Sequence, residues 1–180
     1  WPSGMSFSAR YFDRLFLNQL TQEDWEKEAL KLQKKLTDEV IENSIREWPK
    51  EIFNIRGEEI IRKLKTRRDK IDQYPLEHYQ FLSRYVDVVN SNKDEIFEVK
   101  TLPNGDVEVT LFKQAKGDER GRKIYERLFR KGETKEIRLY GLGGKDEFTI
   151  TGESKRGIRI RIIGGGGKDY VDASQSMGKQ

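Results

Sequence analysis

The chain has 180 residues and a mass of 21.2 kDa, enough for one domain or two small ones with a modest core. Hydrophobic residues make up 34% and charged residues 37%, so we expect a thin core, while 11% aromatic residues exclude general disorder. The 35 basic and 31 acidic residues alternate along the first half, which argues against the focused positive field of a nucleic-acid-binding protein.

The sequence contains no cysteine, which excludes disulfides, thiolate catalysis and cysteine-based zinc sites. Its longest apolar run is well short of the roughly 20 residues that cross a bilayer, so we expect no direct membrane insertion. The chain starts at Trp1 without an initiator methionine or a signal-peptide pattern. We therefore interpret it as a segment of a longer protein.

The first half has apolar residues at helical spacing. Thr21, with Asp24 three positions later, resembles a capping box at a helix start. Pro49 follows one helical pattern, and Pro75 starts or kinks the last one. The expected helices cover residues 8–20, 21–36, 37–48, 57–74 and 76–86. The side chains expected to form the core between them are Trp25, Trp48, Tyr11, Phe12 and Phe16.

The second half changes to the period of strands. Residues 95–114 alternate apolar and polar types on both sides of Asn104-Gly105, which is a strong hairpin signal. Residues 123–132 predict a third antiparallel strand, and short strands broken by glycines follow. The sequence therefore predicts an α+β fold, with a helical subdomain at residues 1–88 and a β subdomain at residues 89–180.

A glycine-rich turn occurs twice, 23 residues apart, as GLGGKD from Gly141 and GGGGKD from Gly164. The strand patterns before the two turns also match. Such self-similarity indicates stacked structural units. We expect the small antiparallel hairpin sheet to run into two coils of a parallel β-roll or β-helix. Glycine suits turns where stacked chains approach closely, and aspartate suits them because its carboxylate accepts hydrogen bonds from turn amides.

The second turn, GGGGKDYVD, fits the nonapeptide of calcium-binding β-rolls at every specified position, and the first departs only at Leu142. In such rolls calcium lies between stacked turns, held by carboxylates and backbone carbonyls. The candidate calcium ligands are therefore Asp146 and Asp169. Lys145 and Lys168 would place positive charge beside the ion, and the 23-residue step is not a multiple of nine. Purely structural turns are thus the preferred interpretation, with calcium as the alternative.

No pattern in the chain identifies a reaction. His78 is the only histidine, and its place among aromatic residues favours a partly buried helix residue over a catalytic base. The glycines of LYGLGG precede a strand pattern, whereas a dinucleotide fingerprint requires a helix at that point. We expect no catalytic and no cofactor-binding residues in the chain.

Several stretches together resemble one protein family: ARYFDRLFLNQLTQEDW, LQKKLTDEVIENSIREWPKEI, GEEIIRKLKTRRDK, YVDVVNSNKDEIFEV and TKEIRLYGLGGKDEFTITG. They are similar to a connecting segment of large multidomain Bacteroidetes outer-membrane and surface-antigen proteins, which are often labelled metallophosphoesterases and end in a C-terminal β-barrel. The resemblance implies a location in the periplasm or at the outer membrane. It implies as partners the neighbouring domains of the same polypeptide or another envelope protein. It carries over no phosphoesterase residue, because the family's metal-binding His/Asp set does not occur in this sequence.

The sequence therefore predicts a non-catalytic structural or interaction module that links domains of a larger cell-envelope protein. The first alternative is a calcium-binding β-roll module. The second is a part of a phosphoesterase-type hydrolase whose catalytic residues lie outside these 180 residues.

Overall fold

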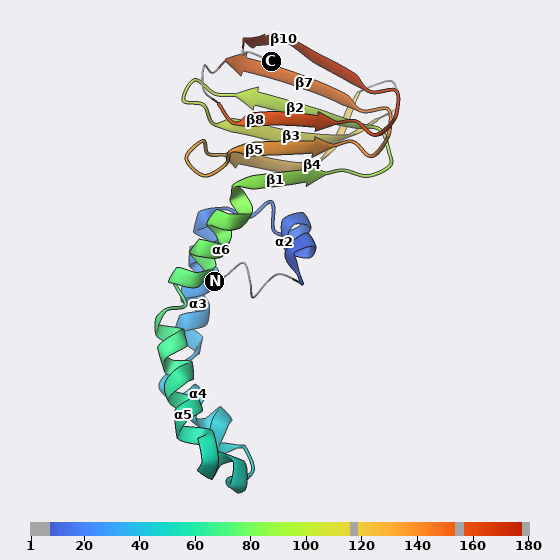
Figure 1. Ribbon diagram of the computed structural model, residues 1–180. Helices are drawn as coiled ribbons and strands as arrows, with labels where there is room; N and C mark the ends of the chain where they lie inside the picture. The colour runs from blue at the N-terminus through green and yellow to red at the C-terminus, as the bar shows by residue number, and fades with distance from the viewer. Residues whose placement is uncertain (1–7, 116–118, 154–156, 178–180) are drawn as a thin grey trace. The chain divides into compact units, whose positions relative to one another are not determined.

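The computed structural model describes residues 8–115, 119–153 and 157–177 (Figure 1). The chain divides into two compact units, which are considered separately. Unit 1 is Leu20–Tyr79, and unit 2 contains the described residues of Ser6–Gln19 and Gln80–Gln180. Helices dominate the first part of the sequence and strands the second, which confirms the α+β class.

Unit 1 is built from consecutive helices joined by short links. They are α3 (Gln22–Lys35), α4 (Asp38–Arg46), α5 (Lys50–Asp69) and the first part of α6 (Gln73–Ser83). The predicted capping box is confirmed: the Thr21 hydroxyl accepts from the Asp24 amide, and the Asp24 carboxylate accepts from the Thr21 amide at 2.9 Å. Thr37 caps α4 in the same way, through the amide of Val40 at 3.2 Å.

Helix α5 begins earlier than the sequence pattern predicts. The carbonyl of Pro49 accepts hydrogen bonds from the amides of Ile52 and Phe53, both at 2.9 Å, and so starts the helix directly after the proline. The sequence pattern predicts the helix start at Gly57, but this residue lies inside α5. A Cβ atom at Gly57 would stand 2.4 Å from the ring of Phe53, so this glycine makes room for the ring.

The predicted aromatic core between the helices is wrong. Tyr11, Phe12 and Phe16 belong to unit 2 and are 72%, 70% and 65% exposed, and Trp48 is also exposed. Trp25 packs instead against the rings of His78 and Tyr79. The cluster of buried residues in unit 1 is aliphatic, because the apolar faces of α4 and α5 supply isoleucines: Ile41, Ile45 and Ile61.

Unit 2 contains one short helix, the last part of α6, and all the strands. The helix is α2 (Arg10–Phe16). The strands are β1 (Tyr85–Val89), β2 (Glu95–Thr101), β3 (Val107–Gln114), β4 (Arg120–Phe129), β5 (Glu136–Tyr140), β6 (Gly143–Gly144), β7 (Glu147–Glu153), β8 (Arg159–Ile163), β9 (Gly166–Gly167) and β10 (Tyr170–Met177).

The boundary of the units differs from the expected division between residues 88 and 89. Helix α6 ends at Ser83, and the β-branched run from Val86 forms β1 instead of continuing the helix. Helix α2, expected in the helical subdomain, packs against β1. The contacts of α2 with residues far away in sequence assign it to unit 2, and its position in the sequence alone does not predict this assignment.

The hairpin at Asn104-Gly105 is confirmed. Strands β2 and β3 pair antiparallel, and Gly105 has the positive φ of 91° that favours glycine. Strand β4 pairs antiparallel with β3, as the sequence predicts. These strands form one side of a five-stranded sheet in the order β10-β7-β2-β3-β4.

The strands on either side of the two glycine-rich turns pair in parallel, at an offset of 23 residues up to a register shift after Asp172 in β10. Ile137 pairs with Ile160, Gly143 with Gly166, and Phe148 with Val171. Each pair lies 23 residues apart, in three different sheets. The sequence repeat therefore corresponds to strands that lie side by side in the same direction (Figure 1).

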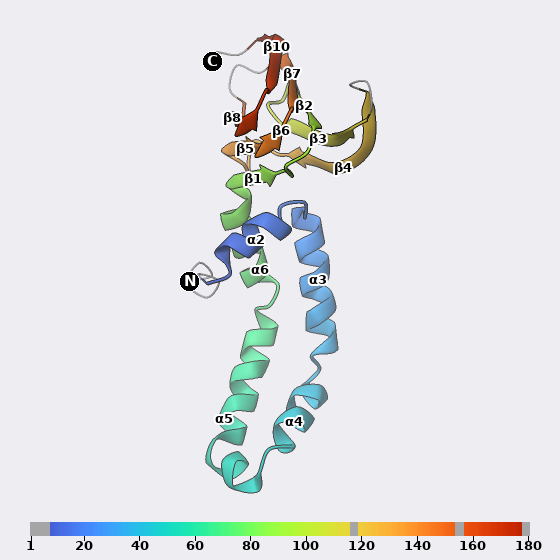
Figure 2. The same ribbon diagram turned by 90° about the vertical axis from the view of Figure 1, so that its right-hand side faces the viewer.

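The core of unit 2 lies between the β1-β5-β8 sheet and the five-stranded sheet (Figure 2). The rings of Phe97 and Phe148 stack inside it with centroids 4.4 Å apart. Ile137 and Leu139 of β5 are fully buried against them. Burial alternates along β1 and β3, so one face of each of these strands supplies this core, and Phe97 and Val99 of β2 join it.

We predict that Gly167→Ala destabilises unit 2 by about 1–3 kcal/mol, because Gly167 has φ of 130° and an alanine there would be strained. A Cβ atom would also meet the carbonyl oxygen of Gly144 in the neighbouring turn. The neighbouring Gly166→Ala is the matched control, since its Cβ would find only one atom, at 3.9 Å. Urea unfolding followed by circular dichroism measures both; equal losses would contradict the close approach of the turns.

Candidate functional site

The strand register shows a third turn, without glycine, in the same place as the two glycine-rich turns. The amide of Asn90 donates to the carbonyl of Tyr140, and the amide of Gly141 donates to the carbonyl of Ile163. Asn90, Gly141 and Gly164 therefore open three stacked turns, which cover residues 90–95, 141–146 and 164–169. The pairing of the strands that follow shows that the three turns have equal length.

Each of the three turns ends on an acidic residue. Glu147 pairs with Ile96 on one side and with Tyr170 on the other, so the residues before them occupy one equivalent position. We call these residues the corner carboxylates: Glu95, Asp146 and Asp169. Sequence analysis found the last two and missed Glu95.

The reason for this miss is a difference of one residue in register. The letters KDE occur from Lys93 and again from Lys145, and matching them gives an offset of 52. In the structure Phe97 pairs with Phe148, which is an offset of 51. The pair of phenylalanines at positions 97 and 148 gives the correct register, because a buried aromatic residue must keep its position in the core while the turn residues can change.

Two of the three corner carboxylates bind backbone amides of the neighbouring turns. Asp146 Oδ1 accepts from the amide of Glu95 at 3.1 Å, and Asp169 Oδ1 accepts from the amide of Asp146 at 3.2 Å. Asp94, beside the corner, accepts from the amide of Lys145 at 2.8 Å. As the sequence predicts, these aspartates accept hydrogen bonds from turn amides; the amides belong to the neighbouring turn, which the stacking brings within reach.

Glu95 is 0% exposed, and donors of its own turn bind both carboxylate oxygens. Asn90 Nδ2 and Ser91 Oγ each donate to it at 2.5 Å. Burial raises the pKa of Glu95 above its ordinary value, although these two hydrogen bonds act in the opposite direction. Asn90 and Ser91 take the places of glycine and leucine in the second turn, where no such donors exist.

Asp146 is 1% exposed and only partly satisfied. Its Oδ2 atom is buried and forms no hydrogen bond with the part of the chain that the structure describes. Burial raises the pKa of Asp146 to about 7, and the nearby negative charges of Glu95, Asp169 and Asp94 act in the same direction. This carboxyl group therefore titrates close to neutral pH.

The glycine that opens each of the last two turns makes room for the corner carboxylate. A Cβ atom at Gly141 would stand 2.4 Å from Asp146 Oδ2, and one at Gly164 would stand 2.2 Å from Asp169 Oδ2. In the first turn Asn90 occupies this position and donates to Glu95. The turns therefore accommodate the corner carboxylate in two ways: a glycine leaves space for it, or an asparagine donates a hydrogen bond to it.

The structure brings the two predicted calcium ligands to neighbouring corners. Asp146 is buried and Asp169 is exposed, and each uses one oxygen to accept a backbone amide. Lys145 and Lys168 are exposed beside them. Within residues 8–115, 119–153 and 157–177, no group of three or more His, Cys, Asp or Glu side chains is arranged to hold a metal ion.

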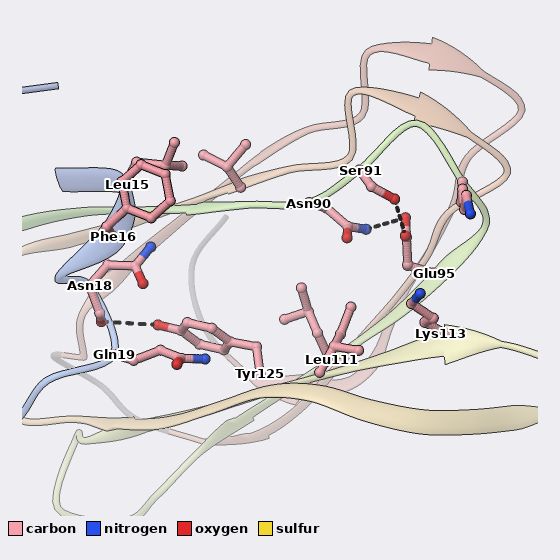
Figure 3. A pocket seen from close by; sticks show the side chains of 13 residues that line it. Leu15, Phe16, Asn18, Gln19, Asn90, Ser91, Glu95, Leu111, Lys113 and Tyr125 are labelled. Carbon is pink, nitrogen blue, oxygen red and sulfur yellow. Dashed lines mark hydrogen bonds between the residues drawn. The ribbon is translucent and has the colours of Figure 1, made fainter. Parts of the chain in front are cut away.

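A pocket of about 520 Å³ opens beside Glu95 in unit 2 (Figure 3). Figure 3 shows Glu95 with Asn90 and Ser91 at one end and Asn18 at the other. The side chains that line the pocket between these ends are mostly apolar: Leu15, Phe16, Val89, Leu111, Ile124 and Tyr125. Lys93 and Lys113 complete the polar end.

Asn18, in the loop after α2, connects that loop to the strands around the pocket. Its side chain donates to the carbonyl of Asp87 at 2.8 Å, and its own carbonyl accepts from the Tyr125 hydroxyl at 3.3 Å and from the Arg127 guanidinium. Burial raises the pKa of Tyr125, so its hydroxyl stays protonated as a donor. Sequence analysis could not find this contact, because it joins residues more than 100 positions apart.

No family model matches the chain, and no curated protein or solved structure matches it either. Among the helices that the structure describes, none is both long and apolar enough to cross a membrane. The function is therefore inferred from the corner carboxylates, the pocket and the strand arrangement.

We predict that Asp146→Asn increases stability at neutral and alkaline pH. The folded-state pKa of about 7 lies above the ordinary 3.8, so the stability of the neutral form is present below pH 4 and lost as the pH rises toward 7. Asparagine keeps an acceptor for the Glu95 amide and carries no charge. At pH 8 we expect a gain of about 1–3 kcal/mol. The shift of the Asp146 pKa from its ordinary value, at about 1.4 kcal/mol per pKa unit, sets the upper limit of this gain.

Urea unfolding between pH 5 and 8 measures this gain, which should shrink as the pH falls. Asp169→Asn is the matched control at an exposed corner, and it should keep most of the wild-type slope. An Asp146→Asn protein with the wild-type pH profile would show that this carboxylate is not the titrating group.

Proposed function

We propose that the chain is a non-catalytic structural and interaction module that links neighbouring domains of a larger cell-envelope protein. The observation that carries this proposal is the use of the corner carboxylates. Asp146 and Asp169 bind backbone amides of neighbouring turns, and Glu95 is bound by two donors of its own turn. The corner carboxylates thus hold the turns in place.

In this proposal the stacked turns belong to coils of a parallel β-roll. The first coil contains β1 and β2, the second β5 to β7, and the third β8 to β10. The 23-residue pairing between the second and third coils, which holds up to the register shift after Asp172, supports this arrangement. Strands β3 and β4 then extend one side of the roll as an antiparallel hairpin.

The third coil supplies a surface suited to a neighbouring domain. In the described residues β8, β9 and β10 each lie at the edge of their sheet. Edge strands present unpaired backbone groups that can pair with another extended segment. Tyr170 and Val171 on β10 are also half exposed or more.

Unit 1 offers a second surface for interaction, at the turn between α4 and α5. Ile55 is 74% exposed, and Ile52 and Trp48 beside it in sequence are exposed as well. Exposed apolar clusters of this kind are typical of contact sites between proteins. The proposed partners are neighbouring domains of the same polypeptide or another envelope protein, in the periplasm or at the outer membrane.

We predict that hydrogen exchange distinguishes a linking role from an isolated one. In the 180-residue chain, the β10 amides that do not pair with β7 should exchange rapidly, because they lie at a sheet edge. Within the longer polypeptide the same amides should be protected by a neighbouring segment. Mass spectrometry of deuterated peptides measures both, with the β3 amides as an internal control. Equal, rapid exchange in both proteins would contradict the linking role.

A calcium-binding β-roll is the second candidate function. It is favoured by one observation: Asp146 Oδ2 and the carbonyl oxygen of Gly164 both border the space above Gly141. Calcium prefers such oxygen ligands. In the leading proposal this space stays closed to ions, because the same carboxyl group serves the stacking of the turns.

We therefore predict that 5 mM calcium leaves the thermal midpoint unchanged relative to excess chelator. A site with a Kd of about 0.05 mM would instead stabilise the fold by about 2.7 kcal/mol at this concentration. Scanning calorimetry of the wild type and of Asp169→Asn decides the question. A rise in the midpoint that Asp169→Asn abolishes would replace the leading proposal by the calcium-binding one. Hydrolysis of a phosphate ester by the purified chain would contradict its non-catalytic character.

A further inference from the structure

The pocket beside Glu95 has no place in the structural role of the turns. Its volume of about 520 Å³ lies within the range of small-molecule sites, about 300–1,000 Å³. The pocket is therefore large enough for a ligand of small-molecule size.

The walls of the pocket are apolar and held in place by the sheet. Leu111 of β3 and Tyr125 of β4 pair directly across the two strands and are both buried. The register shifts next to this pair, from Leu111–Tyr125 to Phe112–Lys123, and leaves Ile124 without a partner in the ladder. Such a bulge lets Ile124 line the pocket together with its neighbour Tyr125, where strict alternation would turn it away.

The opposite wall comes from α2 and β1. Leu15, Phe16 and Val89 line the pocket there, and Leu15 and Phe16 are partly exposed at its mouth. The Asn18 contacts with Asp87 and Tyr125 hold this wall across the strands. A ligand thus meets an apolar surface on both sides.

The polar end of the pocket holds one carboxylate and two lysines. Glu95 lies there, but Asn90 and Ser91 already bind both of its oxygens, and the side chain is fully buried. It is therefore not available to pair with a cationic ligand. Lys113 lies directly opposite Glu95 in the register of β2 and β3, and Lys93 belongs to the turn above.

Two ammonium groups are accessible to a ligand at this end. Lys93 and Lys113 are exposed, and within the residues that the structure describes neither forms an ion pair. Burial has the larger effect and raises the pKa of Glu95, whereas the charge of Lys113 lowers it, and Asp94 is a further acidic group nearby. The cationic groups that line this end of the pocket are therefore Lys93 and Lys113.

We propose that this pocket binds a small anionic amphiphile, a molecule with an apolar body and a carboxylate or phosphate head. The body lies against Leu111, Ile124 and Tyr125. The head lies at the polar end, where the ammonium groups of Lys93 and Lys113 bind it. The site gives the linking module a ligand of its own, separate from any contact with neighbouring domains.

The test compares three ligands of equal chain length with the wild-type protein: decanoate and decyltrimethylammonium below their micelle-forming concentrations, and 1-decanol below its solubility limit. Calorimetry measures affinity, and heteronuclear NMR locates the site. We expect decanoate to bind at least about tenfold more tightly than the other two. It should shift the amide signals of β3, β4 and the loop after α2.

Two variants test the assigned contacts. Lys93→Gln combined with Lys113→Gln should weaken decanoate on the order of tenfold and leave 1-decanol unchanged. Ile124→Trp should fill the pocket and abolish binding of decanoate and of 1-decanol. Lys100→Gln is the matched control, because Lys100 is exposed on the other face of β2.

Four results would overturn the proposal: equal affinity for the three ligands, tighter binding of the cation, decanoate affinity unchanged in the double lysine variant, or signal shifts confined to other parts of the chain. The absence of decanoate binding up to about 5 mM would overturn it as well. If Ile124→Trp does not fold, the double lysine variant decides alone, since both of its side chains are exposed.

Discussion

The hydrogen bond from a backbone amide to the carboxylate of the neighbouring turn is the interaction on which the β-sheet unit depends. Strands β6 and β9 are only two residues long, so the ladder alone leaves corner amides without partners. Asp146 and Asp169 supply the missing acceptors. Their carboxylates need space, which explains the glycines at Gly141 and Gly164. The same stacking removes Asp146 from water and so weakens its acidity.

Local signals accounted for much of the fold. The hairpin followed from Asn104-Gly105, because few residues other than glycine adopt its positive φ. The start of α3 followed from Thr21 and Asp24, because a capping box lies within four residues. The calcium candidates Asp146 and Asp169 came from a repeat in adjacent sequence, and they do lie at neighbouring corners.

Two kinds of feature could not be predicted from the sequence. One is a contact between residues far apart in the chain, and the other is a turn that stabilises its carboxylate by different residues from those of the other turns. The first turn holds Glu95 with side-chain donors instead of the space that glycine provides, so its letters do not match the other two turns. Asn18 connects the loop after α2 to strands that lie much later in the sequence, and no local pattern predicts that contact. The aromatic residues of α2 looked like core because periodicity gives the apolar face of a helix without saying whether anything covers it.

Burial decreases along the column of corner carboxylates, from Glu95 and Asp146 to the exposed Asp169. This decrease limits how far such a stack can grow. Every turn laid over the last one would withdraw another acid from solvent and set it between two others. Growth in alkaline surroundings would then accumulate uncompensated charge along one edge, whereas in mildly acidic surroundings each newly covered acid would take up a proton. Elongation of this architecture is thus linked to proton uptake, with donors such as Asn90 and Ser91 as the means of escaping that dependence.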